Sequence, residues 1–232
     1  MDKKKLDQQS QHWEKNFSNK PEMFGLEPSQ AAIQAKKIFQ EQKVSSFFSR
    51  KKIEVLELGA GLGRDTTYFV DSELIHVTAL DYSPEAIKII NKKKEDFEIS
   101  DRDRITTKVW DVRNKLPFKD NSFDGCFSHM LYCMALSTSD LISLNKEIYR
   151  ILKPGGINIY TVRHTGDGDY KSGIHIGEDL YENDGFIVHF FSKDKINQLS
   201  KDFEIIDIAE FEEGTFPRKL FLVTLKKKSL TR

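Results

Sequence analysis

Three glycines at alternate positions, Gly59, Gly61 and Gly63, follow a short apolar run and precede a stretch with helical character. Glycine tolerates positive φ and lets a ligand touch bare backbone. The helix that begins behind such a loop offers unpaired N–H groups and a positive dipole end, which suit a carboxylate or a phosphate. The loop therefore predicts a site for an anionic group, although a tight turn without a ligand would use the same residues.

Two aspartates stand at matching places after the next two apolar runs. Asp81 follows residues 74–80, and Asp111 follows residues 105–110. The carboxyl ends of strands form the ligand-binding edge of an open α/β sheet, so the glycine loop and both carboxylates are expected there together. A carboxylate in the position of Asp81 can accept hydrogen bonds from both hydroxyls of a ribose.

The spacing of the glycines disfavours two kinds of phosphate site. A dinucleotide fingerprint requires Gly-x-Gly-x-x-Gly, but here the third glycine comes one residue early and Arg64 occupies its place. A Walker loop requires Lys followed by Ser or Thr, and neither pair follows Gly63. A nicotinamide-dependent oxidoreductase is therefore the least favoured enzyme class.

Alternating apolar strands and amphipathic helices must position these residues. The last two strands are joined by only six residues, too few for a crossover helix, so they should form an antiparallel hairpin. We expect an α/β fold, with a seven-stranded, mostly parallel sheet, helices on both faces and this C-terminal hairpin. The expected strands are 53–58, 74–80, 105–110, 122–128, 157–162, 203–211 and 220–225, and the expected helices include 64–70, 84–97, 140–152 and 192–200.

Two further segments lie outside this alternation. Residues 1–49 predict two helices, the first with Trp13 and Phe17 on one face and the second opening at Pro28 or Ser29. They form either a lid or helices packed on the sheet. Residues 164–191 are rich in Gly, Asp and His, are expected to be irregular, and are longer than a plain connection needs.

Composition limits the class of protein. The chain has 232 residues, 38% hydrophobic and 31% charged, with a formal net charge of zero. This suits one domain over 1–232 and argues against disorder or a global basic field for nucleic acid, though not against a local patch. No apolar run suggests a membrane span or a secretory signal. Cys126 and Cys133 form no Cys-x-x-Cys pair, so we expect buried packing thiols in a cytoplasmic protein.

Five segments in order resemble the class I S-adenosylmethionine-dependent methyltransferases, whose fold is Rossmann-like. The resemblance is tight over about 50–163 and loose over the terminal strands. Arg64-Asp65-Thr66 also resembles the variant of the first motif seen in small-molecule members of the family. The matching segments are Glu57–Gly63, Leu80–Ile87, Asp111–Val112, Leu116–Asp124 and Glu147–Gly156.

The resemblance implies S-adenosylmethionine as the cofactor and a role for each matching residue. The glycines would pack under the methionine and ribose, Asp81 would hold the ribose hydroxyls and Tyr82 would lie against the adenine. Asp111 and the Val112 backbone would serve the ring edge. Arg64 and Asp65 would assist the methionine carboxylate and amino group. The complete expected cofactor set is Glu57, Gly59, Ala60, Gly61, Gly63, Arg64, Asp65, Asp81, Tyr82, Asp111, Val112, Ser128 and His129.

The methyl acceptor is expected beside the segment 164–191, because it leaves the carboxyl end of the fifth strand. His164 is expected to point toward the transferred methyl group, where a neutral imidazole could accept a proton. The histidines and acids of this segment match no known metal-ligand spacing, so no metal ligands are assigned. A metal site and a merely polar loop stay open as alternatives for this segment. The expected acceptor pocket contains Trp13, Phe17, Tyr132, Tyr170 and Tyr181.

The favoured function is methyl transfer to a small molecule by in-line displacement. Methylation of RNA or protein is an alternative, but residues 127–130 lack the Pro-Pro of many nucleic-acid enzymes and the net charge is zero. A non-catalytic module that only binds the cofactor is a second alternative. The sequence leaves the acceptor and the oligomeric state open.

Overall fold

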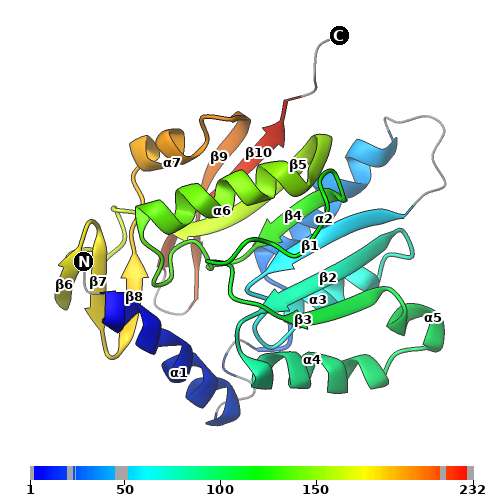
Figure 1. Cartoon of the computed structure of the whole chain (residues 1–232), viewed down its shortest axis with the longest axis horizontal. Helices are drawn as coiled ribbons and strands as arrows, with labels where there is room; N and C mark the ends of the chain where they lie inside the picture. Colours follow the sequence, from blue (N-terminus) through cyan, green and yellow to red (C-terminus); the bar gives the residue numbers. More distant parts are fainter. Residues whose placement is uncertain (1–2, 20–22, 24, 45–51, 215–217, 229–232) are drawn as a thin grey trace.

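The computed structural model describes residues 3–19, 23, 25–44, 52–214 and 218–228. A seven-stranded sheet in the order β3-β2-β1-β4-β5-β10-β9 runs through the centre (Figure 1). Neighbouring strands from β3 to β5 are parallel, whereas β10 is antiparallel to β5 and to β9. The strands are β1 (Ile53–Leu58), β2 (Ile75–Asp81), β3 (Ile105–Val109), β4 (Phe123–Ser128), β5 (Leu152–Arg163), β9 (Phe203–Glu213) and β10 (Arg218–Lys227).

Helices cover both faces of this sheet, as the alternation predicts. On one face, α2 (Gln30–Val44), α3 (Arg64–Val70) and α4 (Pro84–Glu95) bury side chains such as Phe39, Phe69 and Ile90. On the other face, α6 (Thr138–Ile151) and α7 (Lys193–Leu199) bury Leu144 and Leu199. Helix α5 (Ile99–Arg102), between α4 and β3, is one short turn that was not expected from the sequence.

Helix starts follow local capping chemistry. Ser83 accepts a hydrogen bond from the Ala86 N–H, and Pro84 occupies the first turn of α4. Ser137 and Asp140 form a capping box, which starts α6 at Thr138, two residues before the expected start. These caps fix where the chain leaves the carboxyl edge of the sheet.

The junction between α6 and β5 differs from the expectation. The Lys153-Pro154-Gly155-Gly156 segment lies inside β5, which begins directly after α6 at Leu152. The pairing of β4 with β5 shifts between Phe123↔Leu152 and Gly125↔Ile157, so the extra residues form an irregularity in the strand.

Residues 164–191 are not irregular throughout, and this part of the prediction is wrong. They contain an antiparallel sheet of β6 (Ile174–Gly177), β7 (Leu180–Asn183) and β8 (Phe186–His189). These strands have four residues each and carry interspersed charges, so they give little periodic signal. The turns between them use positive φ at Glu178, Asp184 and Gly185.

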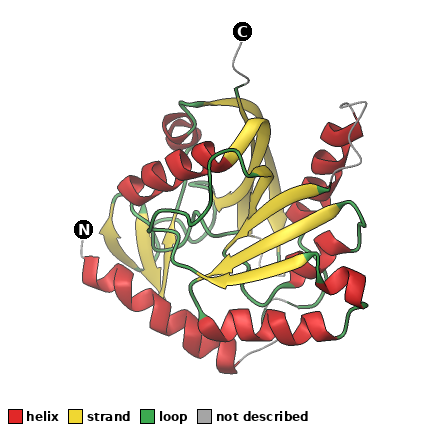
Figure 2. Ribbon diagram, turned by 45° about the vertical axis from the view of Figure 1, so that its right-hand side comes forward, coloured by secondary structure: helices red, strands yellow, loops and turns green. Residues whose placement is uncertain are grey.

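The two N-terminal helices have different surroundings. Helix α2 lies on the sheet, with Ala31, Ala35 and Phe39 buried, and the Phe39 ring fills the space where a Cβ of Gly125 would stand. Helix α1 (Lys3–Asn19) lies away from the main sheet, beside β8 and α4 (Figure 2). The expected lid over 1–49 stays a prediction, and 1–2, 20–22, 24 and 45–49 of it lie outside the described residues.

Two smaller expectations concern the cysteines and the membrane. Cys126 and Cys133 are both buried and unpaired, as predicted. None of the helices in the described ranges is long and apolar enough to cross a membrane.

Candidate active site

The glycine loop forms at the carboxyl end of β1, where the strand order reverses between β2 and β4. Gly59, Gly61 and Gly63 all have positive φ, at 68°, 53° and 78°. A Cβ on Gly59 would stand 3.1 Å from the Leu131 side chain, and one on Gly63 would stand 2.6 Å from Ile90. The glycines therefore allow both the backbone turn and the close approach of the neighbouring elements.

Asp81 holds this loop to the end of β2. Its carboxylate accepts hydrogen bonds from the Gly61 N–H and the Ser83 N–H, each at 2.9 Å. Burial raises the pKa of Asp81 to about 6, although these two backbone donors oppose the shift, and Glu14 raises it further. A carboxylate has about four acceptor positions, so the backbone donors leave capacity on Asp81, and its contact with two hydroxyls stays a prediction.

Two more acids lie behind the glycine loop. Glu57 is buried and accepts a 2.5 Å hydrogen bond from the Thr66 hydroxyl, and burial with the nearby Asp65 raises its pKa well above the usual range. Asp65 accepts from the N–H and the hydroxyl of Ser29, at 2.7 and 2.8 Å. Asp65 thus joins α3 to the start of α2, a structural role in place of the predicted contact with an amino group.

The expected adenine end gathers Tyr82, Asp111 and Val112. Tyr82 is largely buried, and burial near Asp81 and Asp111 raises the pKa of its phenol. Asp111 forms a bidentate pair with Arg113, which holds the pKa of Asp111 below its usual range despite partial burial. An adenine amino group and the Arg113 guanidinium would therefore compete as hydrogen-bond donors to the Asp111 carboxylate.

The carboxyl end of β4 carries Ser128 and His129. The Ser128 hydroxyl is buried and has no hydrogen-bond partner among the described residues. His129 lies between two partners that the sequence analysis missed, with Nδ1 3.0 Å from the Thr161 Oγ1 and Nε2 3.1 Å from the Glu213 Oε2. Arg64 reaches the other oxygen of Glu213, at 3.9 Å.

Helix α1 covers the glycine loop. The Phe17 ring lies 3.9 Å from the position of a Gly61 Cβ, and Trp13 contacts both Phe17 and Phe186 of β8. The Glu14 carboxylate accepts a hydrogen bond from the Ser83 hydroxyl and another, at 3.2 Å, from the Glu85 N–H. Trp13 and Phe17 therefore lie beside the glycine loop, and their place in an acceptor pocket stays a prediction.

The three tyrosines expected in the pocket are not together. Tyr132 is completely buried, stacked on Tyr160 at 4.1 Å, and donates its hydroxyl to Asn145. It belongs to the core under α6, which corrects its assignment to the pocket. Tyr170 and Tyr181 contact each other within the 164–191 segment, and the Tyr170 hydroxyl donates to Asp179.

The catalytic role expected for His164 does not fit the structure. Its ring packs on Phe221 of β10 at 4.6 Å, and its Nδ1 accepts a hydrogen bond from the Gly166 N–H. Burial lowers its pKa, and the charges around it belong to Asp167, Lys193, Glu210 and Lys219. These contacts lie on the β10 side of β5, whereas the glycine loop lies beyond β4.

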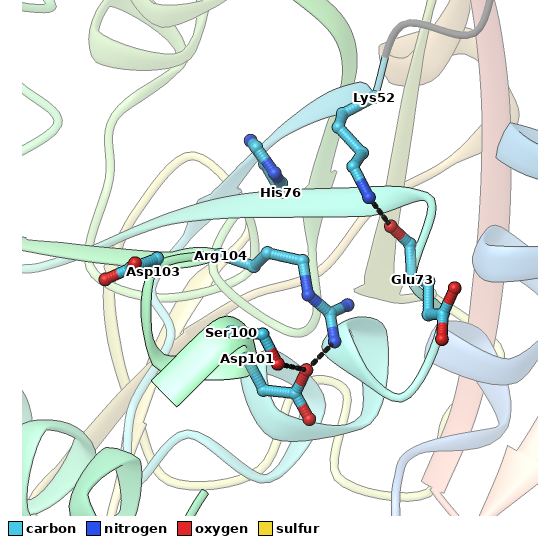
Figure 3. A pocket seen from close by; sticks show the side chains of 7 residues that line it. All are labelled: Lys52, Glu73, His76, Ser100, Asp101, Asp103 and Arg104. Carbon is cyan, nitrogen blue, oxygen red and sulfur yellow. Dashed lines mark hydrogen bonds and ion pairs between the residues drawn. The ribbon is translucent and has the colours of Figure 1, made fainter. Parts of the chain in front are cut away.

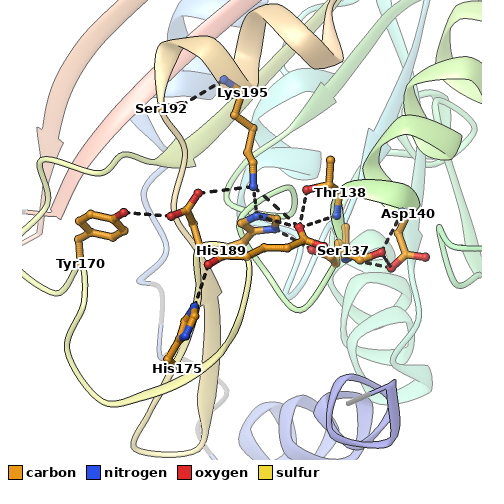
Figure 4. A network of polar contacts seen from close by, with 11 residues as sticks. Ser137, Thr138, Asp140, Tyr170, His175, His189, Ser192 and Lys195 are labelled. Atoms are coloured by element: carbon orange, nitrogen blue, oxygen red, sulfur yellow. Dashed lines mark hydrogen bonds and ion pairs between the residues drawn. The ribbon is translucent and has the colours of Figure 1, made fainter. Parts of the chain in front are cut away.

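A polar network fixes the 164–191 segment to α6 and α7 (Figure 4). His189 is fully buried, with Nδ1 2.7 Å from the Leu136 carbonyl, so this nitrogen carries the proton and Nε2 accepts from the Lys195 ammonium. Burial and Lys195 lower the pKa of His189 to about 4. Glu178 accepts from the Thr138 N–H at 3.0 Å, which ties the turn before β7 to the start of α6.

A pocket of about 320 Å³ lies at the opposite, amino edge of the sheet (Figure 3). Its charged groups pair with protein atoms: Arg104 with Asp101 and the Val70 carbonyl, and Lys52 with the Glu73 carbonyl. It is remote from the strand ends described above and takes no part in that site. Its lining residues are Lys52, Glu73, His76, Ser100, Asp101, Asp103 and Arg104.

Residues 55–156 match a family model described as a methyltransferase domain. Over these residues, which are fewer than half of the chain, the sequence is similar to that methyltransferase domain. The matched range of this methyltransferase domain contains the glycine loop, Asp81, Asp111 and His129. Helix α1, the 164–191 segment and Glu213 lie outside it.

Two curated relatives share sequence with the methyltransferase domain. Phosphoethanolamine N-methyltransferase 1 of Triticum aestivum is 40% identical over 103 residues, which are 44% of this chain and 20% of that protein. 24-Methylenesterol C-methyltransferase 2 of Arabidopsis thaliana is 25% identical over 150 residues, 63% of this chain and 38% of that protein. The chain thus spans less than half the length of either relative.

A solved structure shares the fold. The 1,6-didemethyltoxoflavin-N1-methyltransferase of Burkholderia thailandensis, with its substrate and S-adenosylhomocysteine bound, has a TM-score of 0.69. The match covers 95% of this chain and 88% of that protein at 18% identity. Similarity at this level supports the architecture of the sheet and of the methyltransferase domain.

The sequence analysis missed Glu14, Thr161 and Glu213. Strand β9 runs in the same direction as β5, so its last residue, Glu213, reaches the same edge as Asp81. The strand-end rule that found Asp81 and Asp111 would have found Glu213 had it been extended to the hairpin. No local signal marks Glu14, which acts through a contact 69 positions away in the sequence.

Proposed function

We propose that this chain is an S-adenosylmethionine-dependent methyltransferase that acts on a small-molecule acceptor by in-line displacement. The observation that carries the proposal is the glycine loop held by Asp81 at the reversal point of the strand order. Open α/β sheets bind ligands at this point. The match of residues 55–156 to the methyltransferase domain supports the same conclusion.

The residues at this edge fit the chemical groups of S-adenosylmethionine. Asp81 is a buried carboxylate with acceptor capacity for a diol, and the Ser128 hydroxyl is a buried polar group without a hydrogen-bond partner in the part of the chain that the structure describes. Gly61 leaves bare backbone facing Phe17. When bound, S-adenosylmethionine supplies a methyl group on a positively charged sulfur.

The chain's own contribution is to bind, orient and exclude water. The backbone of the glycine loop and Asp81 would hold the cofactor, while Phe17 and Leu131 would cover it with apolar surface. Holding an acceptor atom in line with the methyl carbon and the sulfur, in a dry site, is the main source of rate enhancement. His129, rather than His164, is the imidazole at this edge, and a proton from an acceptor that must lose one would reach its Nδ1 in place of the hydrogen bond from the Thr161 hydroxyl.

Two measurements test the proposal. Calorimetry should show S-adenosylmethionine and S-adenosylhomocysteine binding in the low-micromolar range, on the order of −8 kcal/mol. Radiolabelled S-adenosylmethionine should then label at least one member of a panel of small thiols, amines, carboxylates and hydroxy compounds, with RNA and protein as comparison acceptors. Binding of NAD without S-adenosylmethionine would overturn the cofactor, and labelling of RNA or protein alone would overturn the acceptor class.

The proposal includes a cytoplasmic location and no nucleic-acid partner. Two buried, unpaired cysteines suit a reducing compartment. The net charge of zero gives no general attraction for a phosphate backbone.

A further inference from the structure

We propose that Glu213 is a positioning residue that holds the His129 ring in one tautomer and one orientation at the methyl-transfer end of the site. The inference rests on the proposed function, because it assigns His129 a place beside the transferred methyl group. Glu213 lies at the end of β9, outside the part of the chain that matches the methyltransferase domain.

The hydrogen bonds around His129 fix its tautomer. The Glu213 carboxylate can only accept a hydrogen bond, so the His129 Nε2, 3.1 Å away, carries the ring proton and donates to it. In the neutral ring the Nδ1 then has no proton and accepts from the Thr161 hydroxyl at 3.0 Å. The Thr161 Oγ1 in turn accepts a hydrogen bond from the Met130 N–H at 2.8 Å. A hydroxyl, an imidazole and a carboxylate thus stand in one chain of hydrogen bonds.

The placement of this series of hydrogen-bonded side chains points to a role at the site rather than only in the core. His129 follows β4, and the neighbouring Leu131 touches Gly59 of the glycine loop. The second oxygen of Glu213 lies 3.9 Å from the Arg64 Nη2, at the first residue of α3. Glu213 therefore connects the loop after β4 with the helix that follows the glycine loop.

Glu213 is suited to remain ionised in this position. Its side chain is 25% exposed, and this partial burial alone would raise its pKa. The hydrogen bond from His129 and the positive charge of Arg64 outweigh burial and hold the pKa of Glu213 below its usual range. A carboxylate that accepts from an imidazole N–H orients the ring and stabilises any imidazolium that forms, as in serine hydrolases.

The first test reads the tautomer of His129 directly. Nitrogen-15 NMR of the full chain without cofactor, near pH 8, should show the His129 proton on Nε2 in the wild type. The resonances are assigned by their loss in His129→Asn. In Glu213→Gln and Glu213→Ala the single tautomer should give way to a mixture, and Glu213→Asp should restore it in part. A wild-type proton on Nδ1, or an unchanged tautomer in both Glu213→Gln and Glu213→Ala, overturns the proposal.

The second test separates positioning from cofactor binding. With the best acceptor of the panel above, Glu213→Gln should lower kcat at least tenfold and leave the KM for S-adenosylmethionine within about threefold. Glu212→Gln, an exposed neighbour on the same strand, is the matched control and should behave as the wild type. An undiminished kcat in Glu213→Gln overturns the proposal. Failure of the wild type to bind S-adenosylmethionine overturns the proposed function instead, and the tautomer measurement distinguishes the two results.

Discussion

The cofactor edge and the proposed acceptor side of this molecule are held together in different ways. At the cofactor edge, residues of neighbouring strand ends meet through backbone geometry, as in the hydrogen bond from the Gly61 N–H to Asp81. On the proposed acceptor side, α1 and the small β6–β8 sheet meet through side chains far apart in the sequence. Gln9, for example, bonds the backbone of Gly185 and Ile187.

This difference separates what the fold dictates from what the individual chain adds. A parallel sheet brings its strand ends together whatever the side chains are, so a glycine or a carboxylate at a strand end is placed by topology. Side-chain contacts such as Trp13 with Phe186 depend on both partners and carry no topological requirement. The cofactor edge should therefore respond to single substitutions more strongly than the acceptor side.

The largest effect is expected at Asp81. Asp81→Ala removes the acceptor of two ribose hydroxyls and the support of the Gly61 N–H, so S-adenosylhomocysteine should bind about 100-fold more weakly, or about 3 kcal/mol. Asp111→Ala should cost only about tenfold, because Asp111 is already paired with Arg113. Calorimetric titration of both variants measures the contrast, and equal affinities in the wild type and Asp81→Ala would remove Asp81 from the site.

A second substitution tests whether the glycine loop is fixed by sterics as well as by φ. Gly63→Ala should lower the free energy of unfolding by about 2.5 kcal/mol, from left-handed backbone strain and overlap with Ile90. Gly25→Ala is the matched control, because Gly25 has a similar φ of 71° but no atom of the described residues lies within 4 Å of a Cβ there. Urea denaturation should show a clearly smaller loss for Gly25→Ala; equal losses would leave no steric contribution from Ile90.

The pH dependence of cofactor binding should sharpen the role of Asp81. With a pKa of about 6 in the free protein, Asp81 is mostly ionised at pH 7.5 and mostly protonated at pH 5.5. If the carboxylate form accepts the ribose hydroxyls, affinity for S-adenosylhomocysteine should fall about fourfold between these values. Calorimetry at both pH values measures the fall, and the same fall in Asp81→Asn would assign it to another group.

The raised pKa of Asp81 makes folding stability change with pH in the opposite direction from cofactor affinity. Because the folded pKa lies above the unfolded value of 3.8, the native state binds more protons between the two. The contribution of Asp81 to stability is therefore fully present below the unfolded pKa and is lost as pH rises through about 6. Stability and cofactor affinity should thus change in opposite directions over this window.

The smallest effect is expected on the acceptor side. Glu14→Ala removes the side-chain contacts of α1 with Ser83 and the Glu85 N–H, so the lid should open more readily and S-adenosylhomocysteine should dissociate about threefold faster. Lys15→Ala, on an exposed position of the same helix, should leave the rate unchanged. Stopped-flow displacement measures both, and an equal rate in Glu14→Ala and the wild type would show that α1 does not gate the cofactor.

The fold and the cofactor edge could be predicted because they depend on short-range patterns. The strand ends at Gly59, Asp81 and Asp111 are legible in a few consecutive residues. The β6–β8 sheet could not be predicted, because its strands are held by partners such as Lys195 and Thr138 rather than by their own periodicity.

The misplacement of His164 has a geometric cause. Side chains alternate along a strand, and His164 continues the row of Tyr160 and Val162, which face the core under α6 and α7. Thr161 belongs to the other row and meets His129. The position of His164 at the end of β5 correctly predicted the edge of the sheet at which it lies. The alternation of side chains along the strand decides on which face of the sheet each residue lies.

The long reach of α1 has a consequence for the order of folding. Its contact with Ile187 joins residues 178 positions apart, so α1 is synthesised well before the backbone that it docks against. A 17-residue helix with few buried apolar side chains is marginal on its own in water. Since closing so long a loop is favourable only after the intervening sheet has formed, α1 should dock late, and the covered site should be among the last parts of the molecule to assemble.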